Sequence, residues 1–181
     1  MTATLLAAAP FGKAAAVMAR MPEGHLHLGL ALRDSVGVAQ HVHLAWNDRL
    51  ERDWPWPATL WTVPLEATEE ILFELARRAR QVLSRFDRSA SMPFGIGWNG
   101  SDFEVESGRL RLAPGSLGLT CATFVLALFR AVGIDLIHES TWPVRTEDDR
   151  QFVAFARRFD LDLATRLDEE VDRGCRRIRP E

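Results

Sequence analysis

Residues 25–33 read His-Leu-His-Leu-Gly-Leu-Ala-Leu-Arg, and residues 38–46 read Val-Ala-Gln-His-Val-His-Leu-Ala-Trp. Both stretches alternate with a period of two, which is typical of strands that bury one face. The intervening Asp34-Ser-Val-Gly37 is a turn signal, so the two stretches predict a β-hairpin. One face of this hairpin is apolar. The other face carries four histidines: His25, His27, His41 and His43.

The register of the hairpin decides which histidines meet. In one register His27 lies opposite His43. In a register shifted by two residues, all four histidines stay on one face but His27 lies opposite Ala45. A longer loop would bury His41 and His43 among the leucines, which is unfavourable for groups that can carry charge. The remaining residues of the histidine face are small (Gly29, Ala31 and Ala45), so we expect a helix N-terminus to approach this face closely.

The rest of the chain predicts further strands and helices. Trp54-Pro-Trp-Pro57 is expected to form a rigid loop, because proline fixes φ. Thr68 is expected to cap a helix that runs to about Phe86, with acidic residues in its first turn. The other expected elements are strands at 60–65, 94–98, 102–105 and 109–112, and helices at about 121–132, 146–158 and 161–173. Strands and helices segregate, which predicts the α+β class, with an antiparallel sheet packed against helices.

Length and charge limit the possible functions. The 181 residues fit a single domain, 1–181, with an N-terminal segment at 1–20 and a polar tail at 174–181. The net charge of −3 provides no basic field for nucleic acid. No apolar run is long enough to cross a bilayer. We therefore expect neither a nucleic-acid partner nor a transmembrane segment, and the oligomeric state stays unknown.

Compartment is inferred from the N-terminus and the cysteines. The apolar stretch Met1–Ala9 is followed, not preceded, by Lys13 and Arg20, which is the reverse of a secretory signal. Cys121 and Cys175 are the only cysteines, too few for a disulfide scaffold. We therefore expect a cytoplasmic protein.

Cys121 is the candidate nucleophile. The stretch Leu119-Thr-Cys-Ala-Thr-Phe-Val125 places it in the first turn of a buried helix, where unpaired N–H groups and the helix dipole stabilise a thiolate. We therefore expect its pKa to lie below that of an ordinary thiol. A thiol nucleophile needs a general base, and the hairpin offers imidazoles. The alternative is that Cys121 is a small apolar core residue. Cys175, in the polar tail, is a poor candidate.

Two short patches resemble a known superfamily. His27-Leu-Gly-Leu-Ala-Leu32, a turn, and Val42-His-Leu-Ala-Trp46 resemble the two-histidine hairpin of lecithin retinol acyltransferase-like proteins, which are circularly permuted relatives of NlpC-type, papain-like cysteine enzymes. Thr120-Cys-Ala-Thr-Phe-Val125 is similar to the helix that opens with their nucleophile, and the order His, His, Cys is the permuted one. The resemblance implies a permuted papain-like fold with Cys121 as nucleophile, His27 as base and His43 as the polar third member. The turn is longer here, and the extra His41 stays an alternative base.

The predicted chemistry is acyl transfer through a thioester. Cys121 would attack an amide, ester or thioester of a small-molecule, lipid or peptide substrate, and both hydrolysis and acyl transfer fit. The backbone N–H of Cys121, with another donor from 116–120, would bind the oxyanion. This chemistry needs no metal and no cofactor. Two alternatives are a catalytically silent binding module on the same scaffold and a metal-binding protein, because two His-x-His pairs could hold Zn²⁺.

Overall fold

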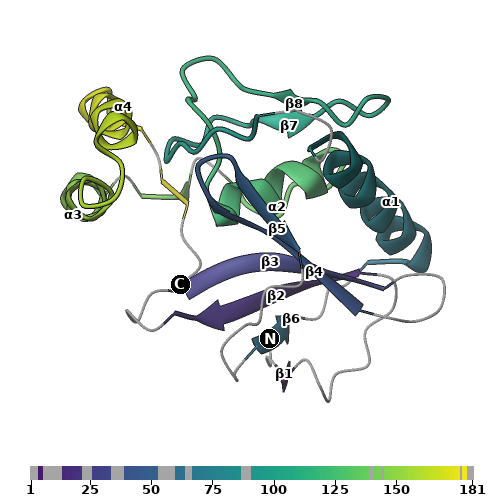
Figure 1. The fold of residues 1–181 in the computed structure, drawn as a ribbon. Helices are drawn as coiled ribbons and strands as arrows, with labels where there is room; N and C mark the ends of the chain where they lie inside the picture. The colour runs from purple at the N-terminus through teal and green to yellow at the C-terminus, as the bar shows by residue number, and fades with distance from the viewer. Residues whose placement is uncertain are drawn as a thin grey trace.

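The computed structural model describes residues 4–5, 14–21, 26–33, 39–52, 60–63, 67–86, 91–138, 141–143, 145–175 and 177–178. Over these residues the chain is an α+β protein, as predicted. Its main sheet is antiparallel, in the order β1-β6-β2-β3-β4-β5 (Figure 1). The strands are β1 (Thr4–Leu5), β2 (Ala14–Arg20), β3 (Leu26–Arg33), β4 (Ala39–Trp46), β5 (Arg49–Arg52), β6 (Leu60–Val63), β7 (Asp102–Phe103) and β8 (Leu110–Arg111). The helices are α1 (Glu69–Phe86), α2 (Cys121–Arg130), α3 (Thr146–Ala156) and α4 (Leu161–Asp172).

The histidine hairpin is present as β3 and β4. Its pairs, among them Leu30 with Val42 and Ala31 with His41, follow the shifted register. The register that would place His27 directly opposite His43 is therefore wrong. This pairing extends only from Leu30 to Arg33 on β3, and β4 continues beyond it to pair with β5.

The N-terminal segment contains a strand that the sequence pattern did not indicate. β2 lies between β3 and β6. Its residues Ala14 to Val17 and Ala19 are all buried, so both faces of the strand are covered. A strand buried on both faces has no reason to alternate apolar and polar residues. Its sequence, Ala-Ala-Ala-Val-Met-Ala-Arg, therefore carries no period of two.

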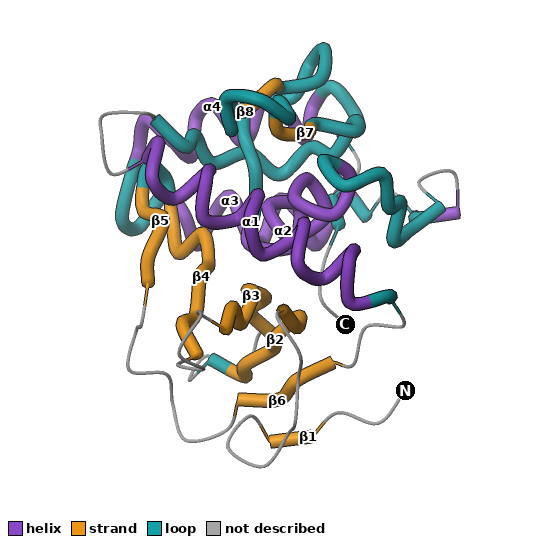
Figure 2. The backbone as a smooth tube through the Cα atoms, turned by 90° about the vertical axis from the view of Figure 1, so that its right-hand side faces the viewer, coloured by secondary structure: helices purple, strands orange, loops and turns teal. Residues whose placement is uncertain are grey.

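The apolar face of the hairpin packs against the helices. Leu30, Leu32, Val42 and Leu44 share one core with apolar residues of α1, α2 and α4. Figure 2 shows α1 and α2 between the β2–β3 part of the sheet and the small β7–β8 sheet. The helix that begins with Cys121 thus covers the leucine face, whereas we had expected it on the histidine face. No helix among the described residues is long and apolar enough to span a membrane.

The helices lie close to where the sequence places them. Thr68 Oγ1 accepts a hydrogen bond from the Ile71 N–H at the start of α1, and α1 ends at Phe86 as expected. α2 ends at Arg130, and Gly133 follows with a φ of 80°. That left-handed conformation favours glycine and ends the helix. α3 and α4 are each one to two residues shorter than expected.

The strand expected at 94–98 is wrong. Only isolated bridges form there, Phe94 with Leu119 and Gly97 with Arg177. The N–H groups of Ile96 and Gly97 instead donate to the buried Glu170 carboxylate of α4. A carboxylate distant in sequence therefore replaces the partner strand, which no local pattern reveals. The strands expected at 102–105 and 109–112 form, but each is only two residues long.

The expected polar tail is partly packed. Ile178 is buried, and the Arg177 side chain lies 4.0 Å over the Phe152 ring and 3.6 Å from Asp149 Oδ1. These residues hold the tail against α3 instead of leaving it solvated. The turn at 34–37 and the Trp54–Pro57 loop lie outside the described residues.

Candidate active site

A hydrogen-bonded histidine pair lies inside the hairpin. His27 Nε2 and His43 Nδ1 are 2.8 Å apart, and the two rings are nearly perpendicular, at 88°. His43 is fully buried and His27 is 8% exposed. Although the two residues are not opposite each other in the ladder, they lie on the same face and meet across it. The structure therefore brings together the two histidines that the resemblance singles out.

Gly29 makes room for this pair. A Cβ at position 29 would lie 2.8 Å from the Val42 carbonyl oxygen and 3.0 Å from His43 Cβ. The first distance is shorter than real Cβ atoms show and involves backbone, which cannot move aside easily, and the second is tighter than most real Cβ contacts. The absence of a side chain lets β4 approach β3 closely at the point where His43 leans toward His27.

His43 is a neutral imidazole. Burial above all, together with the positive charges that His27, His41 and Arg49 can carry, lowers its pKa from 6.5 to about 3. Its two ring nitrogens therefore share a single proton at neutral pH, so one donates and the other accepts. His41 lies opposite Ala31. The 2.8 Å contact between the rings makes His43 the partner of His27.

Cys121 is the first residue of α2. Thr120 caps this helix, with its side chain accepting a hydrogen bond from the Thr123 N–H at 3.2 Å. Cys121 is half-buried, and the Leu28 N–H on β3 lies close enough to the thiol to lower its pKa. Leu28 directly follows His27 on β3, so the thiol lies near the backbone of the candidate base, whereas the His27 side chain points away from the face that α2 covers.

The expected low pKa of Cys121 is wrong. Burial raises the pKa of the thiol and outweighs the N–H groups of Leu28 and Ala122 and the charge of Arg177, which lower it. Desolvation penalises an isolated thiolate more than a helix N-terminus stabilises it. The resting group is a thiol, so any nucleophilic role requires a base to remove its proton as it reacts.

The N–H groups around Cys121 limit where an oxyanion could bind. In the loop before it, four N–H groups already donate to other acceptors: those of Ser116, Leu117, Leu119 and Thr120. We expect a second oxyanion donor from 116–120, but none of these four N–H groups is available for that role. The N–H groups of Cys121 and Ala122 lie close enough to the thiol to lower its pKa, which makes them candidate donors to an oxyanion.

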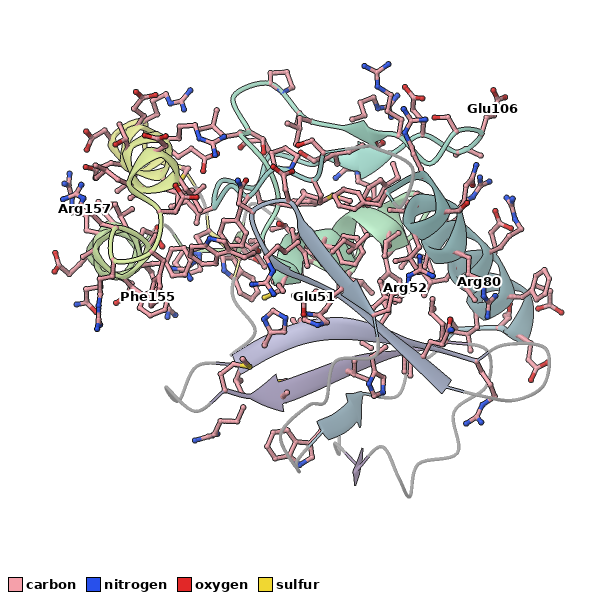
Figure 3. The ribbon with its side chains drawn as sticks, in the orientation of Figure 1. Glu51, Arg52, Arg80, Glu106, Phe155 and Arg157 are labelled. Atoms are coloured by element: carbon pink, nitrogen blue, oxygen red, sulfur yellow. The ribbon has the colours of Figure 1, made fainter. Side chains whose placement is uncertain are left out.

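Glu51 is a site residue that the sequence analysis missed. It lies on β5 directly opposite His43, and its Oε2 is 3.9 Å from His43 Nε2. Figure 3 shows Glu51 between the β5 and β3 ribbons, toward the centre of the molecule. The pair Trp46 and Arg49 would, in an unbroken ladder, place Arg52 opposite His43, but a shift in the pairing between Leu44 and Trp46 places Glu51 there. Period-two counting cannot detect such a bulge.

The other candidates are placed as follows. His138 is exposed, and His25 lies outside the described residues. Within the part of the chain that the structure describes, no group of three His, Cys, Asp or Glu side chains is arranged to hold a metal ion. Burial and the nearby carboxylates of Glu170 and Asp149 raise the pKa of Cys175 to about 12.

Comparisons with protein-family models, curated proteins and solved structures found no match. The assignment of this candidate site therefore rests on the positions of its residues in the structure.

Proposed function

We propose that this protein is a thiol-dependent hydrolase or acyltransferase. The observation that carries the proposal is one arrangement: the Leu28 N–H, at the residue after His27 on β3, lies close to the Cys121 thiol, and His27 is hydrogen-bonded to the buried His43. We propose that Cys121 acts as the nucleophile, His27 as the base and His43 as the orienting group, which is the relay that thiol catalysis requires. The substrate would be an amide, ester or thioester of a small molecule, lipid or peptide.

The proposed reaction passes through a thioester. His27 Nε2 faces His43, so Nδ1 is the nitrogen that takes the Cys121 proton as Sγ attacks the carbonyl carbon. The oxyanion is bound by the N–H groups of Cys121 and Ala122. The C–O, C–N or C–S bond then breaks, and His27 returns the proton to the leaving group. Water or another nucleophile gives its proton to His27 and attacks the thioester, and Sγ leaves and recovers the proton.

We also propose the permuted papain-like fold for this chain. In support, the histidine strands β3 and β4 precede the cysteine helix α2, and α2 packs on the same antiparallel sheet. The cysteines form no disulfide with each other, which fits the expected cytoplasmic location.

One observation favours a second candidate, a catalytically silent binding module. Burial raises the pKa of Cys121, and an inert cysteine of the core would show the same shift. The two functions differ in whether Cys121 can be acylated in the folded protein.

Acylation by p-nitrophenyl acetate tests the proposal. We expect a burst of p-nitrophenolate and an acetyl group on Cys121, found by peptide mass spectrometry. Cys175→Ala should keep the burst and Cys121→Ala should abolish it. His27→Gln should slow it by about a hundredfold, the low end of what a general base contributes. Acetylation of Cys121 that is equally fast in His27→Gln, or that occurs only in urea, would overturn the proposal.

A further inference from the structure

The β4–β5 hairpin brings a carboxylate to the outer side of the histidine pair. A tight turn at Asn47 and Asp48 joins the strands, and Asp48 adopts a φ of 52° there. The bulge before Trp46 then sets His43 opposite Glu51. The Glu51 side chain is 24% exposed, and it forms an ion pair with Arg49. The carboxylate is thus held at the edge of the buried site.

The two nitrogens of His43 face two different groups. Nδ1 faces His27 Nε2 at 2.8 Å, and Nε2 faces Glu51 Oε2 at 3.9 Å. The second distance is too long for a direct hydrogen bond, but a charge this close in a partly buried site still acts on an N–H dipole. A carboxylate only accepts, so its field favours the proton on the nitrogen that faces it.

The position of the proton on His43 determines the position of the proton on His27. A His43 that carries its proton on Nε2 has an accepting Nδ1. The 2.8 Å bond then requires the proton of His27 to be on Nε2. A neutral His27 with its proton on Nε2 has its lone pair on Nδ1, where it can act as a base. In the opposite arrangement, His43 would donate from Nδ1, and His27 would carry its proton on Nδ1 and could not accept another there.

We propose that Glu51 is a positioning residue, which selects the Nε2–H form of His43 and, through it, the Nε2–H form of His27. This inference rests on the proposed function, because it explains how His27 is prepared to accept the Cys121 proton. Arg49 forms an ion pair with Glu51 on the same strand. Among the residues that the structure describes, His27, His41 and Arg49 act on His43 through their charge and Glu51 faces its Nε2; Glu51 is the acceptor-only group of these four.

Imidazole ¹⁵N NMR measures the inference directly. Two-bond proton–nitrogen correlations distinguish the two neutral forms of each histidine in the folded protein. We expect His43 and His27 both to be protonated on Nε2. In Glu51→Ala, His43 should show a mixture of forms, and acetylation of Cys121 by p-nitrophenyl acetate should slow about tenfold.

Two variants serve as controls. Glu51→Gln keeps the size of the side chain but removes its charge, so it should show a mixture of His43 forms as Glu51→Ala does. Arg49→Ala leaves the carboxylate in place, so it should retain the Nε2–H form. An Nδ1–H His43 in the unsubstituted protein, or identical spectra in Glu51→Ala, would overturn the inference.

The two proposals fail in different ways. If Cys121 is never acetylated but the histidines are in the Nε2–H form and respond to Glu51→Ala, the proposed enzyme function fails and the role of Glu51 stands. If acetylation of Cys121 depends on His27 but the histidine spectra are the same in Glu51→Ala, the proposed enzyme function stands and the role of Glu51 fails.

Discussion

The two cysteines of this protein lie at opposite kinds of helix end. Cys121 is the first residue of α2, whereas Cys175 follows the last turn of α4, and its N–H donates to the Glu170 carbonyl. Both are half-buried, and burial raises the pKa of both. The groups that surround them differ. Arginine charges lower the pKa of both, but backbone N–H groups lower only that of Cys121, and the carboxylates of Glu170 and Asp149 raise only that of Cys175.

This difference shows that burial alone does not identify a reactive cysteine. A helix N-terminus presents donors to a forming thiolate, and a helix C-terminus presents carbonyl oxygens. Of the two, only Cys121 also lies beside β3, the strand that carries His27 of the histidine pair. The contrast between the two sites, more than either pKa, supports Cys121 as the functional thiol.

Alkylation should show the largest contrast. With a pKa of about 12, roughly one Cys175 in ten thousand is ionised at pH 8. We expect iodoacetamide to modify Cys121 in the folded protein about a hundredfold faster, because N–H groups and His27 assist loss of its proton. Peptide mass spectrometry at several times and pH values measures both rates. Equal rates, or modification of Cys121 only in urea, would contradict the contrast.

The features on the Cys121 side were partly visible in the sequence. The alternation at 25–33 and 38–46 predicts the hairpin because one of its faces is packed by helices. Cys121 could be placed at a helix start because an apolar run follows it and Gly133 ends it. β2 could not be predicted because both of its faces are buried. Glu51 could not be predicted because a bulge, not the turn alone, sets the register.

The features on the Cys175 side were hidden because they depend on contacts between distant segments. In the sequence, Glu170 is indistinguishable from the exposed acidic residues of an amphipathic helix. In the structure its oxygens accept hydrogen bonds from the N–H groups of Ile96, Gly97 and Leu117. Arg177 reads as part of a charged tail, although it packs on Phe152. Patterns within one element do not encode such pairings.

Glu170→Gln should weaken the contrast between the cysteines. An amide has one acceptor oxygen, so at least one of the three N–H groups loses its partner, at a cost of about 2–3 kcal/mol in the free energy of unfolding. Removing the charge should also lower the pKa of Cys175 and speed its alkylation. Urea denaturation and alkylation measure the two effects. The exposed neighbour Glu169 gives the matched control, since Glu169→Gln should change neither.

His43 should make the stability of the protein depend on pH. Its pKa of about 3 in the folded state lies below its unfolded value of 6.5, so the unfolded chain binds the additional proton between these values. Stability is therefore complete above pH 6.5 and falls as the pH decreases toward 3. Between pH 6.5 and 4.5 the loss due to His43 should be about 2 kcal/mol.

Comparison with His43→Gln isolates this effect from the titration of carboxylates. The variant should lose less stability than the unsubstituted protein when urea denaturation is repeated at the two pH values. His138→Gln, at an exposed position, should behave like the unsubstituted protein. Equal losses in His43→Gln and the unsubstituted protein would show that His43 is not held neutral.

The smallest expected effect concerns the cap that presents Cys121. Thr120 Oγ1 accepts the Thr123 N–H, and the Thr123 hydroxyl accepts the Thr120 N–H at 2.7 Å. Thr120→Ala should cost about 1 kcal/mol in the free energy of unfolding, whereas Thr120→Ser keeps the acceptor and should cost less. If the cap also orients the first turn, Thr120→Ala slows alkylation of Cys121 and leaves that of Cys175 unchanged. Equal slowing at both cysteines would show a general loosening of the fold, and the helix start would then have no special part in the reactivity of Cys121.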